Sequence, residues 1–258
     1  MVKDLAALES QRRVKRADQI VEAVKRWIVV KDIQPGERLP NEKALIELFE
    51  CSKGTVREAL KSLEVQGLIT VKTGPNGGAV LAQVPYPLAS QMLRNYLHFH
   101  AFEGTDIYQL RRLVEPEIAR SVIGHLTEDD YLELERLTEL CTDSPMQSIE
   151  QHLEHRIAEL DFHNLLAERC RNPVLAFIGR FLNDLIKDLI IYNRMEPPGQ
   201  QEFFKSNLYY HRELIKAFKA HDAQAVETLM RDHMCSAHDF SLEVQTQLSR
   251  QQLLSPQS

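Results

Sequence analysis

The sequence predicts a mainly α-helical protein with an N-terminal winged helix-turn-helix, whose wing is a small β-hairpin, and a C-terminal all-helical bundle. Apolar residues recur at helical spacing along most of the chain, whereas a strand-like pattern is confined to residues 68–81, around a glycine-rich turn. The charge is unevenly divided, because residues 1–85 carry a net charge of +3 and residues 86–258 carry −9. All ten histidines lie in the acidic part, which indicates two domains with separate tasks.

The composition excludes several classes of protein. Of the 258 residues, 43% are hydrophobic and 26% are charged, which is typical of a globular protein and not of a disordered one. No apolar run approaches the ~20 residues of a membrane helix and no apolar signal stretch follows Met1, so the sequence predicts a cytoplasmic protein. The cysteines form no CxxC pair, which argues against a zinc ribbon or a disulfide scaffold and favours buried, reduced thiols. They are Cys51, Cys141, Cys170 and Cys235.

Three helices are expected in the N-terminal part. The first begins at Ala17, has apolar residues at helical spacing and ends before the Pro-Gly pair at 35–36. A short second helix follows Asn41, whose side chain is a favourable N-cap, and a third helix follows Ser52 in the same way. Gly67 ends the third helix. Two short helices across a tight turn predict a helix-turn-helix.

A β-hairpin is expected after the third helix. Residues 68–72 are rich in β-forming side chains, residues 73–78 have the composition of a turn, and residues 79–81 are apolar. The order of helix, helix-turn-helix and hairpin is that of a winged helix. In such a domain the third helix enters the DNA major groove and the hairpin reaches the adjacent backbone.

The outer face of the third helix carries side chains that suit DNA binding. Cations and hydroxyl donors match phosphates and guanine edges. They lie mostly in the first turns of this helix, with one further cation in the helix before it: Lys53, Thr55, Arg57, Lys61 and Lys43. The alternative is a solvated helix face without a partner. The coincidence of these side chains with a capped helix-turn-helix and a glycine-rich wing favours DNA binding.

Two runs in the N-terminal part carry a family resemblance. They are Pro35-Gly36-Glu37-Arg38-Leu39-Pro40-Asn41-Glu42 and Ser52-Lys53-Gly54-Thr55-Val56-Arg57-Glu58-Ala59-Leu60, followed by Leu63-Glu64 and Gly67-Leu68-Ile69. Over residues 18–82 the chain resembles the GntR family of bacterial transcription regulators. The resemblance implies that operator DNA is contacted by Lys43, Lys53, Thr55 and Arg57, and by the wing glycines Gly77 and Gly78. The family usually has Arg at positions 43 and 53, and Lys lacks the bidentate fork that reads guanine.

Helical patterns continue through the C-terminal part and predict a bundle. They fall at 88–101, 106–124, 127–142, 148–170, 173–192, 202–220 and 222–246, and residues that stop helices separate them. The chain therefore divides into an N-terminal tail at 1–17, the winged helix-turn-helix at 18–82, a linker at 83–88, a helical domain at 89–246 and a flexible C-terminal tail at 247–258.

Residues with the chemistry of metal ligands lie on three of these helices. Glu159 and His163 are four residues apart and share one helix face, while Asp161 points about 200° away from His163. His211 and His233 lie on two later helices, among apolar residues that direct these faces towards the interior. Three imidazoles and one carboxylate suit Zn²⁺, Ni²⁺ or Mn²⁺. Spacing alone leaves open the interpretation that each histidine is a hydrogen-bonded residue of the core or the surface.

The C-terminal part carries a second resemblance, over residues 107–240. The runs are Leu110-Arg111-Arg112-Leu113-Val114-Glu115-Pro116-Glu117, Phe162-His163-Asn164-Leu165-Leu166, Asn172-Pro173, His211-Arg212-Glu213-Leu214-Ile215 and Met230-Arg231-Asp232-His233. They resemble the FCD effector-binding domain of the FadR-like branch of the GntR family. In that domain three histidines, and an Asp four residues before the first of them, bind a divalent metal beneath a small carboxylate. The resemblance implies the ligands Glu159, His163, His211 and His233, with Glu159 in place of the usual Asp.

Arg111 resembles the arginine that members of this family direct at the effector carboxylate, a task that suits a guanidinium fork. The alternative for Arg111 is a surface salt bridge to Glu115, four residues later on the same helix. The predicted effector is a small carboxylate, either a sugar acid or a dicarboxylate, bound between the metal and Arg111.

These observations predict a ligand-responsive regulator of transcription that acts as a repressor and is not an enzyme. It is expected to be a homodimer, with the helical domain for effector binding and dimerisation, because two recognition helices must meet two half-sites of a palindrome. One alternative is a metal-free regulator that senses an acyl-CoA or another bulky ligand. A second alternative is a metal-dependent hydrolase, against which the absence of an HExxH pattern argues.

Overall fold

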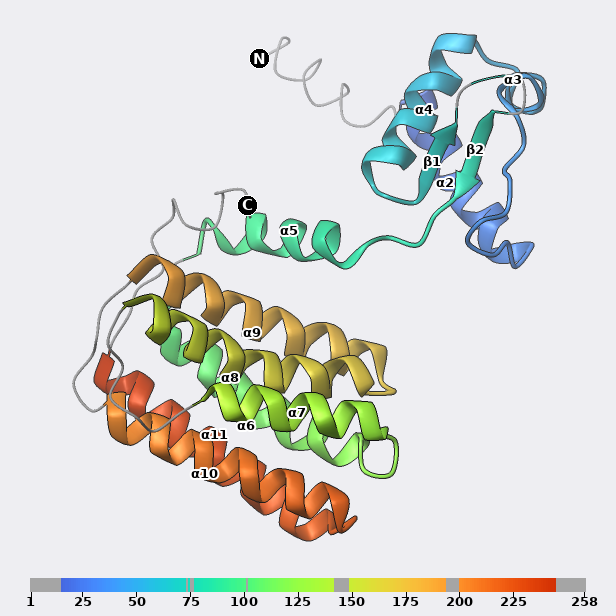
Figure 1. Cartoon of the computed structure of the whole chain (residues 1–258). Helices are drawn as coiled ribbons and strands as arrows, with labels where there is room; N and C mark the ends of the chain where they lie inside the picture. Colours follow the sequence, from blue (N-terminus) through green and yellow to red (C-terminus); the bar gives the residue numbers. More distant parts are fainter. Residues whose placement is uncertain are drawn as a thin grey trace, which may run out of the picture. The chain divides into compact units, whose positions relative to one another are not determined.

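The structure is a computed structural model that describes residues 15–72, 74, 77–100, 102–141, 149–193 and 200–244. It contains two compact units, one ending at Gln91 and the other beginning at Met92, and the mainly helical fold class predicted from the sequence is confirmed (Figure 1). No helix within these residues is long and apolar enough to cross a membrane. The expected tail at 247–258 lies outside the described residues, as do residues 1–14 of the expected tail at 1–17.

The N-terminal unit is a winged helix-turn-helix. Helices α2 (Arg16–Val30), α3 (Glu42–Phe49) and α4 (Lys53–Val65) precede an antiparallel hairpin of β1 (Ile69–Lys72) and β2 (Gly78–Leu81). Both expected N-caps are present. The side chain of Asn41 accepts a hydrogen bond from the Ala44 N–H at 2.9 Å, and Ser52 Oγ accepts one from the Thr55 N–H at 3.2 Å. These caps fix where the two short helices begin.

Apolar side chains from the helices and both strands form the core of this unit. In the hairpin Ile69 lies opposite Leu81 and Lys72 lies opposite Gly78. The inner face of α4 supplies Val56, Ala59 and Leu63, which are fully buried. Because these residues face the core, the polar residues between them point outwards.

Gly67 joins α4 to the hairpin and has a left-handed backbone, with φ of +73°. A Cβ atom at this position would lie 2.5 Å from Leu88 Cδ2, because the chain after the hairpin packs against the end of α4. Glycine is therefore required for both its conformation and its small size.

The C-terminal unit is a helical bundle. Its helices are α5 (Tyr86–Leu97), whose first turns belong to the N-terminal unit, α6 (Gly104–Ser121), α7 (Glu128–Leu140), α8 (Ile149–Arg169), α9 (Pro173–Asn193), α10 (Gln200–Lys219) and α11 (Ala223–Val244). Figure 1 shows α8 beside α9 and α10 beside α11. Helix α6 packs against α8, α9 and α11. It therefore lies within the bundle, where its side chains meet those of its neighbours.

Two local expectations differ from the structure. The expected linker at 83–88 overlaps α5, which begins at Tyr86 because Pro87 stands in its first turn, where a proline leaves no helical hydrogen bond unmade. The boundary between the units therefore falls inside a helix. All four cysteines are free thiols, but Cys51 and Cys235 are only half-buried.

Candidate functional site

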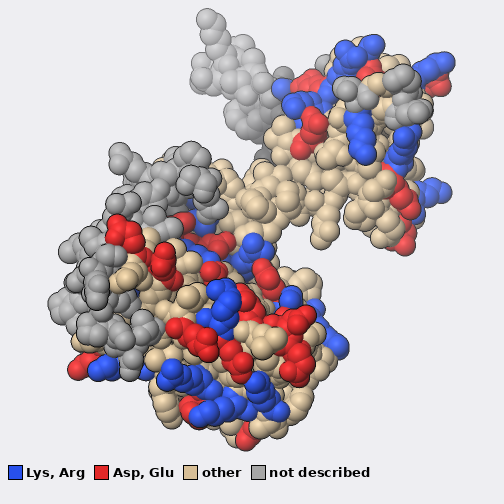
Figure 2. Space-filling model, in the orientation of Figure 1, with Lys and Arg blue, Asp and Glu red and all other residues tan. Residues whose placement is uncertain are grey.

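The outer face of α4 presents an exposed group of cations. The side chains of Lys53, Arg57 and Lys61 are 63%, 64% and 72% exposed. Thr55 is half-buried, and its hydroxyl lies 2.9 Å from Ser52 Oγ. Lys43 on α3 is also exposed. Figure 2 shows many Lys and Arg side chains, with some Asp and Glu among them, on the visible face of the N-terminal unit, and groups of both charges on the C-terminal unit.

Glu42, at the start of α3, contacts two of these cations. One of its carboxylate oxygens lies 3.2 Å from Arg57 Nε and 3.6 Å from Lys53 Nζ. The contact joins the two helices of the helix-turn-helix through the residues expected to meet DNA. The spacing of the residues does not predict these contacts, because Lys53 and Arg57 are 11 and 15 residues away from Glu42 along the chain.

The expected wing is described in part. Gly78 begins β2 with φ of +138°, and the N–H of Gly77 donates to the carbonyl oxygen of Gly74 at 2.8 Å. The hydrogen bond between Gly77 and Gly74 and the backbone conformation of Gly78 belong to the turn of the hairpin. Residues 73, 75 and 76 of the wing lie outside the described residues.

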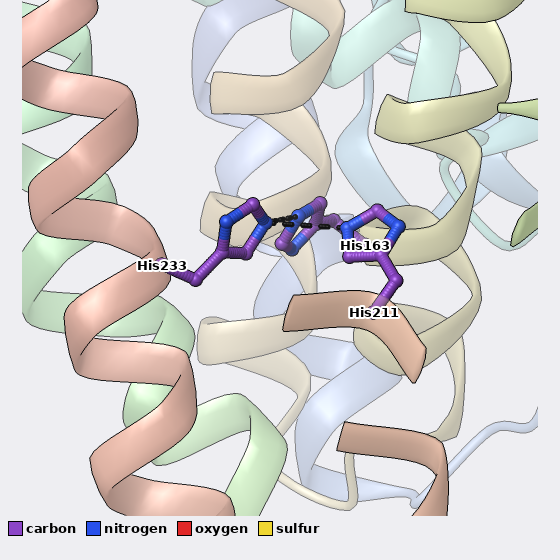
Figure 3. Close-up of side chains that lie close together, drawn as sticks. All are labelled: His163, His211 and His233. Carbon is purple, nitrogen blue, oxygen red and sulfur yellow. Dashed lines mark hydrogen bonds between the residues drawn. The ribbon is translucent and has the colours of Figure 1, made fainter. Parts of the chain in front are cut away.

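Three histidines from three helices meet in the interior of the C-terminal unit (Figure 3). His163 comes from α8, His211 from α10 and His233 from α11, and all three are fully buried. His233 Nε2 lies 3.1 Å from His163 Nε2 and 3.2 Å from His211 Nε2. One nitrogen from each ring lies within 4.8 Å of the others. The structure thus brings together three residues that are up to 70 positions apart in the sequence.

Two of the three separations between these nitrogens fit a shared metal ion. Two imidazole nitrogens about 2.1 Å from one ion lie roughly 3.0 Å apart in octahedral geometry and ~3.4 Å apart in tetrahedral geometry. The observed 3.1 and 3.2 Å fall between these values. Burial lowers the pKa of His211 and of His233 well below the usual value, and the neighbouring histidines and Arg111 lower both pKa values further. Neutral imidazoles are the form that binds metals.

Hydrogen bonding alone does not explain this cluster. His233 Nε2 carries either one proton or one in-plane lone pair, so it can form a hydrogen bond with His163 or with His211 but not with both. The Nε2 atoms of His163 and His211 nonetheless both lie at contact distance from His233 Nε2. An ion that accepts one lone pair from each ring would remove this conflict.

Glu115 on α6 orients the first of the three histidines. Its Oε2 atom lies 3.1 Å from His163 Nδ1, and its Oε1 atom accepts a hydrogen bond from Arg111 Nε at 3.2 Å. Burial acts to raise the pKa of Glu115, but its interactions with His163 and Arg111 outweigh burial and lower the pKa, so the carboxyl group is ionised. A carboxylate on Nδ1 holds the imidazole with Nε2 directed at His233.

Arg111 forms an ion pair with Glu115, which was the alternative prediction for this arginine. The pair is not at the surface, however, because both side chains are completely buried. The Nη1 and Nη2 atoms of Arg111 are also buried and have no hydrogen-bond partner among the described residues. The guanidinium lies 5.5 Å from the centre of the Tyr108 ring. Arg111 thus retains unused donors inside the bundle.

The two candidate carboxylates of α8 have different surroundings. Glu159 lies one turn before His163, is buried, and has no hydrogen-bond partner for either oxygen within the described residues. Its nearest charged group is Arg156, whose Nε is 3.7 Å from Glu159 Oε2. The group of mutually close ligand atoms contains the three histidines and not Glu159. Asp161 instead forms an ion pair with Lys187, as its place on another helix face requires.

Comparisons with known proteins match both units. The model of the bacterial regulatory proteins of the gntR family matches residues 16–77, and the model of the FCD domain matches residues 106–235. The chain is 24% identical over 233 residues to the HTH-type transcriptional repressor NanR of Enterobacter sp. (strain 638). This match covers 87% of this chain and 84% of that protein. The NanR repressor of Escherichia coli (strain K12) has the same identity, over 83% of its length. The solved structure of Streptococcus agalactiae GntR has a TM-score of 0.57 and 24% identity, and the match covers 87% of this chain and 99% of that one.

Proposed function

The chain belongs to the GntR family of bacterial regulatory proteins and carries an FCD domain, and from this membership we propose that a metal-held carboxylate effector controls its binding to operator DNA. The family membership makes it a DNA-binding regulator of transcription and not an enzyme. The proposal concerns what the regulator senses, which residues bind the metal and effector, and which residues contact DNA.

The convergence of three buried imidazole nitrogens carries the proposal of a metal centre. His163, His211 and His233 would hold a divalent ion, with Zn²⁺, Ni²⁺ and Mn²⁺ as the candidates. Glu159 is the proposed fourth ligand, since it is buried, lacks a hydrogen-bond partner in the described part of the chain and lies one turn from His163. When bound, the ion would offer open coordination positions to the oxygens of a carboxylate.

Arg111 is the proposed anchor for the effector. Its Nε is held by Glu115, which leaves the two Nη groups free to bind a carboxylate as a fork. A buried guanidinium with unused donors is costly unless a ligand supplies the acceptor. Binding would be expected to favour one arrangement of the two winged helices of a homodimer and so change how they fit two DNA half-sites.

The cations of α4 are the proposed operator contacts. Lys53, Arg57 and Lys61 are exposed in the helix that enters the major groove in this fold, with Thr55 in its first turn. Lys43 of α3 and the wing glycines Gly77 and Gly78 would meet the adjacent backbone. As in the relatives named as repressors, binding would block transcription.

The test is an operator titration with the full-length protein and DNA from upstream of its own gene. Small carboxylates are added to metal-loaded protein and to protein treated with a chelator. The proposal predicts that a carboxylate changes operator affinity only in the metal-loaded sample. An effect that is equal in both samples, or an effect of acyl-CoA alone, would favour the metal-free regulator.

A further inference from the structure

A second buried polar region lies beside the histidines in the interior of the C-terminal unit. Helices α6 and α8 run in the same direction, because Glu115 contacts His163 and, two turns earlier on each helix, Tyr108 lies close to Arg156. Both contacts join residues that are 48 positions apart. Arg156 therefore lies two turns, about 10 Å along the helix, from the level of the histidines.

Helix α10 follows the same course beside α8. The ring of Phe204 stacks on His155 with centres 4.1 Å apart, and two turns later His211 stacks on Phe162 at 3.9 Å. The guanidinium of Arg156 lies 5.3 Å from the ring centre of Phe203 on α10. At the end of this polar region away from the histidines, the guanidinium of Arg156 therefore lies against the aromatic rings of Phe203 and Phe240.

From the level of Arg156 to the layer one turn before the histidines lie buried polar atoms that have no hydrogen-bond partner in the described part of the chain. They are Arg111 Nη1 and Nη2, Arg156 Nε, both oxygens of Glu159, and Nδ2 and Oδ1 of Asn207. Asn207 is 1% exposed and stands one turn before His211 on α10. Buried polar atoms are nearly always paired. A polar ligand bound among these unpaired atoms would supply the hydrogen-bond partners that they lack.

The buried charges of this region set the charge of that ligand. Arg111 and Arg156 are balanced by Glu115 and Glu159, so the four side chains sum to zero. Imidazoles that bind a metal ion are neutral, so a bound divalent ion would leave an excess of two positive charges. An uncompensated charge is strongly disfavoured in a protein interior. A ligand with two negative charges would restore neutrality.

We propose that the effector is a dicarboxylate, with one carboxylate at the metal and Arg111 and the other directed at Arg156 and Asn207. This proposal rests on the metal-dependent effector site proposed above and narrows its ligand from a carboxylate to a dianion. Two cationic groups at different levels suit two separated carboxylates, including those of a sugar diacid. A sugar acid with one carboxylate, or a phosphate monoester, carries its charge at one end only.

The experiment measures binding to metal-loaded, full-length protein by calorimetry with matched pairs of acids. Each pair has a 2-hydroxy dicarboxylate and the 2-hydroxy monocarboxylate of the same length, with four, five or six carbons. The pairs share the group that would meet the metal and differ only at the far end. For at least one length, we expect the dianion to bind at least tenfold more tightly than the monoanion.

Two variants assign this preference to Arg156. Arg156→Gln removes the charge, and we expect the ratio of the two affinities to fall at least fivefold. Arg156→Lys keeps the charge and should retain most of the preference, which also guards against a general loss of folding. The metal content of every sample is measured alongside, and it should be unchanged in both variants.

The proposal is overturned if no dianion binds, if each monoanion binds as tightly as its partner, or if Arg156→Gln leaves the ratio unchanged. A wild-type protein that holds metal but shows any of these results would refute the dicarboxylate and leave the metal site standing. A wild-type protein that takes up no divalent metal would refute both.

Discussion

His163 Nδ1 lies 3.1 Å from Glu115 Oε2, inside a bundle where both side chains are completely inaccessible to solvent. The contact joins α8 to α6 and leaves His163 Nε2 directed at the other two histidines. Glu115 thus determines how His163 is presented without itself belonging to the histidine cluster.

Glu115→Gln is therefore expected to weaken metal binding. The amide can still meet His163, but it carries no charge to support the imidazole, and changes of this kind typically cost about 10–100-fold in metal affinity. Competition against a chelator of known affinity measures the effect. Glu117→Gln is the control, because Glu117 lies on the same helix and is exposed. Equal affinity in the Glu115 and Glu117 variants would show that Glu115 has no part in the metal centre.

Arg57→Ala is expected to weaken operator binding while the helical content stays unchanged. The side chain is on the outer face of α4 and contributes nothing to the core. Loss of one base or phosphate contact of this kind costs about 1–3 kcal/mol. A gel-shift titration on a footprinted operator measures it, with Arg26→Ala as the control, because Arg26 is an exposed arginine of α2. If both variants bind like the wild type, α4 is not the recognition helix.

Glu42→Gln is expected to reduce discrimination between operator and random DNA. Glu42 holds Arg57 and Lys53 in place, so its loss should weaken specific binding, while the removal of a negative charge should strengthen non-specific binding. Titrations on operator and random duplexes at two salt concentrations give both affinities. Glu22→Gln is the control, because it removes the same charge from α2, where Glu22 pairs with Lys25, a residue with no proposed DNA contact. The same ratio in both variants would mean that Glu42 acts only through its charge.

The metal-free protein is expected to lose stability as the pH falls below about 6.5, the pKa of an unperturbed histidine. The pKa values of His211 and His233 are depressed in the folded state, chiefly by burial, so below that pH the unfolded chain binds more protons than the folded chain. The free energy of unfolding then falls by up to about 1.4 kcal/mol per pH unit for each histidine.

Urea denaturation of the metal-free chain at pH 7.5, 6.5 and 5.5, followed by its helical signal, measures this dependence. The double variant His211→Asn, His233→Asn should show a smaller change between pH 6.5 and 5.5. A change of the same size in both proteins would assign the effect to other groups.

The winged helix could be predicted in detail because its signals are local. Asn41 and Ser52 each cap the helix that begins at the next residue by accepting from the N–H three residues ahead, and Gly67 is required by the backbone at its own position. The contacts of Glu42 could not be predicted in the same way, since they depend on the angle between two helices.

In the bundle the sequence predicted which residues have the chemistry of ligands, but not that they meet. His163, His211 and His233 lie on three helices, and only their packing brings the rings together. The buried role of Glu115 was missed, because a Glu four residues after an Arg is typical of a surface pair. Arg156 and Asn207 gave no signal, since each has an ordinary place on an amphipathic helix.

Whether His163, His211 and His233 hold a divalent ion is decided by the metal content of the full-length protein. Wild type, the double variant His211→Ala, His233→Ala and the surface control His125→Ala are dialysed against Zn²⁺, Ni²⁺ or Mn²⁺ and analysed by mass spectrometry. We expect about one ion per chain in the wild type and the control and none in the double variant. A wild-type protein without bound metal, or a double variant that binds as much as the wild type, would contradict it.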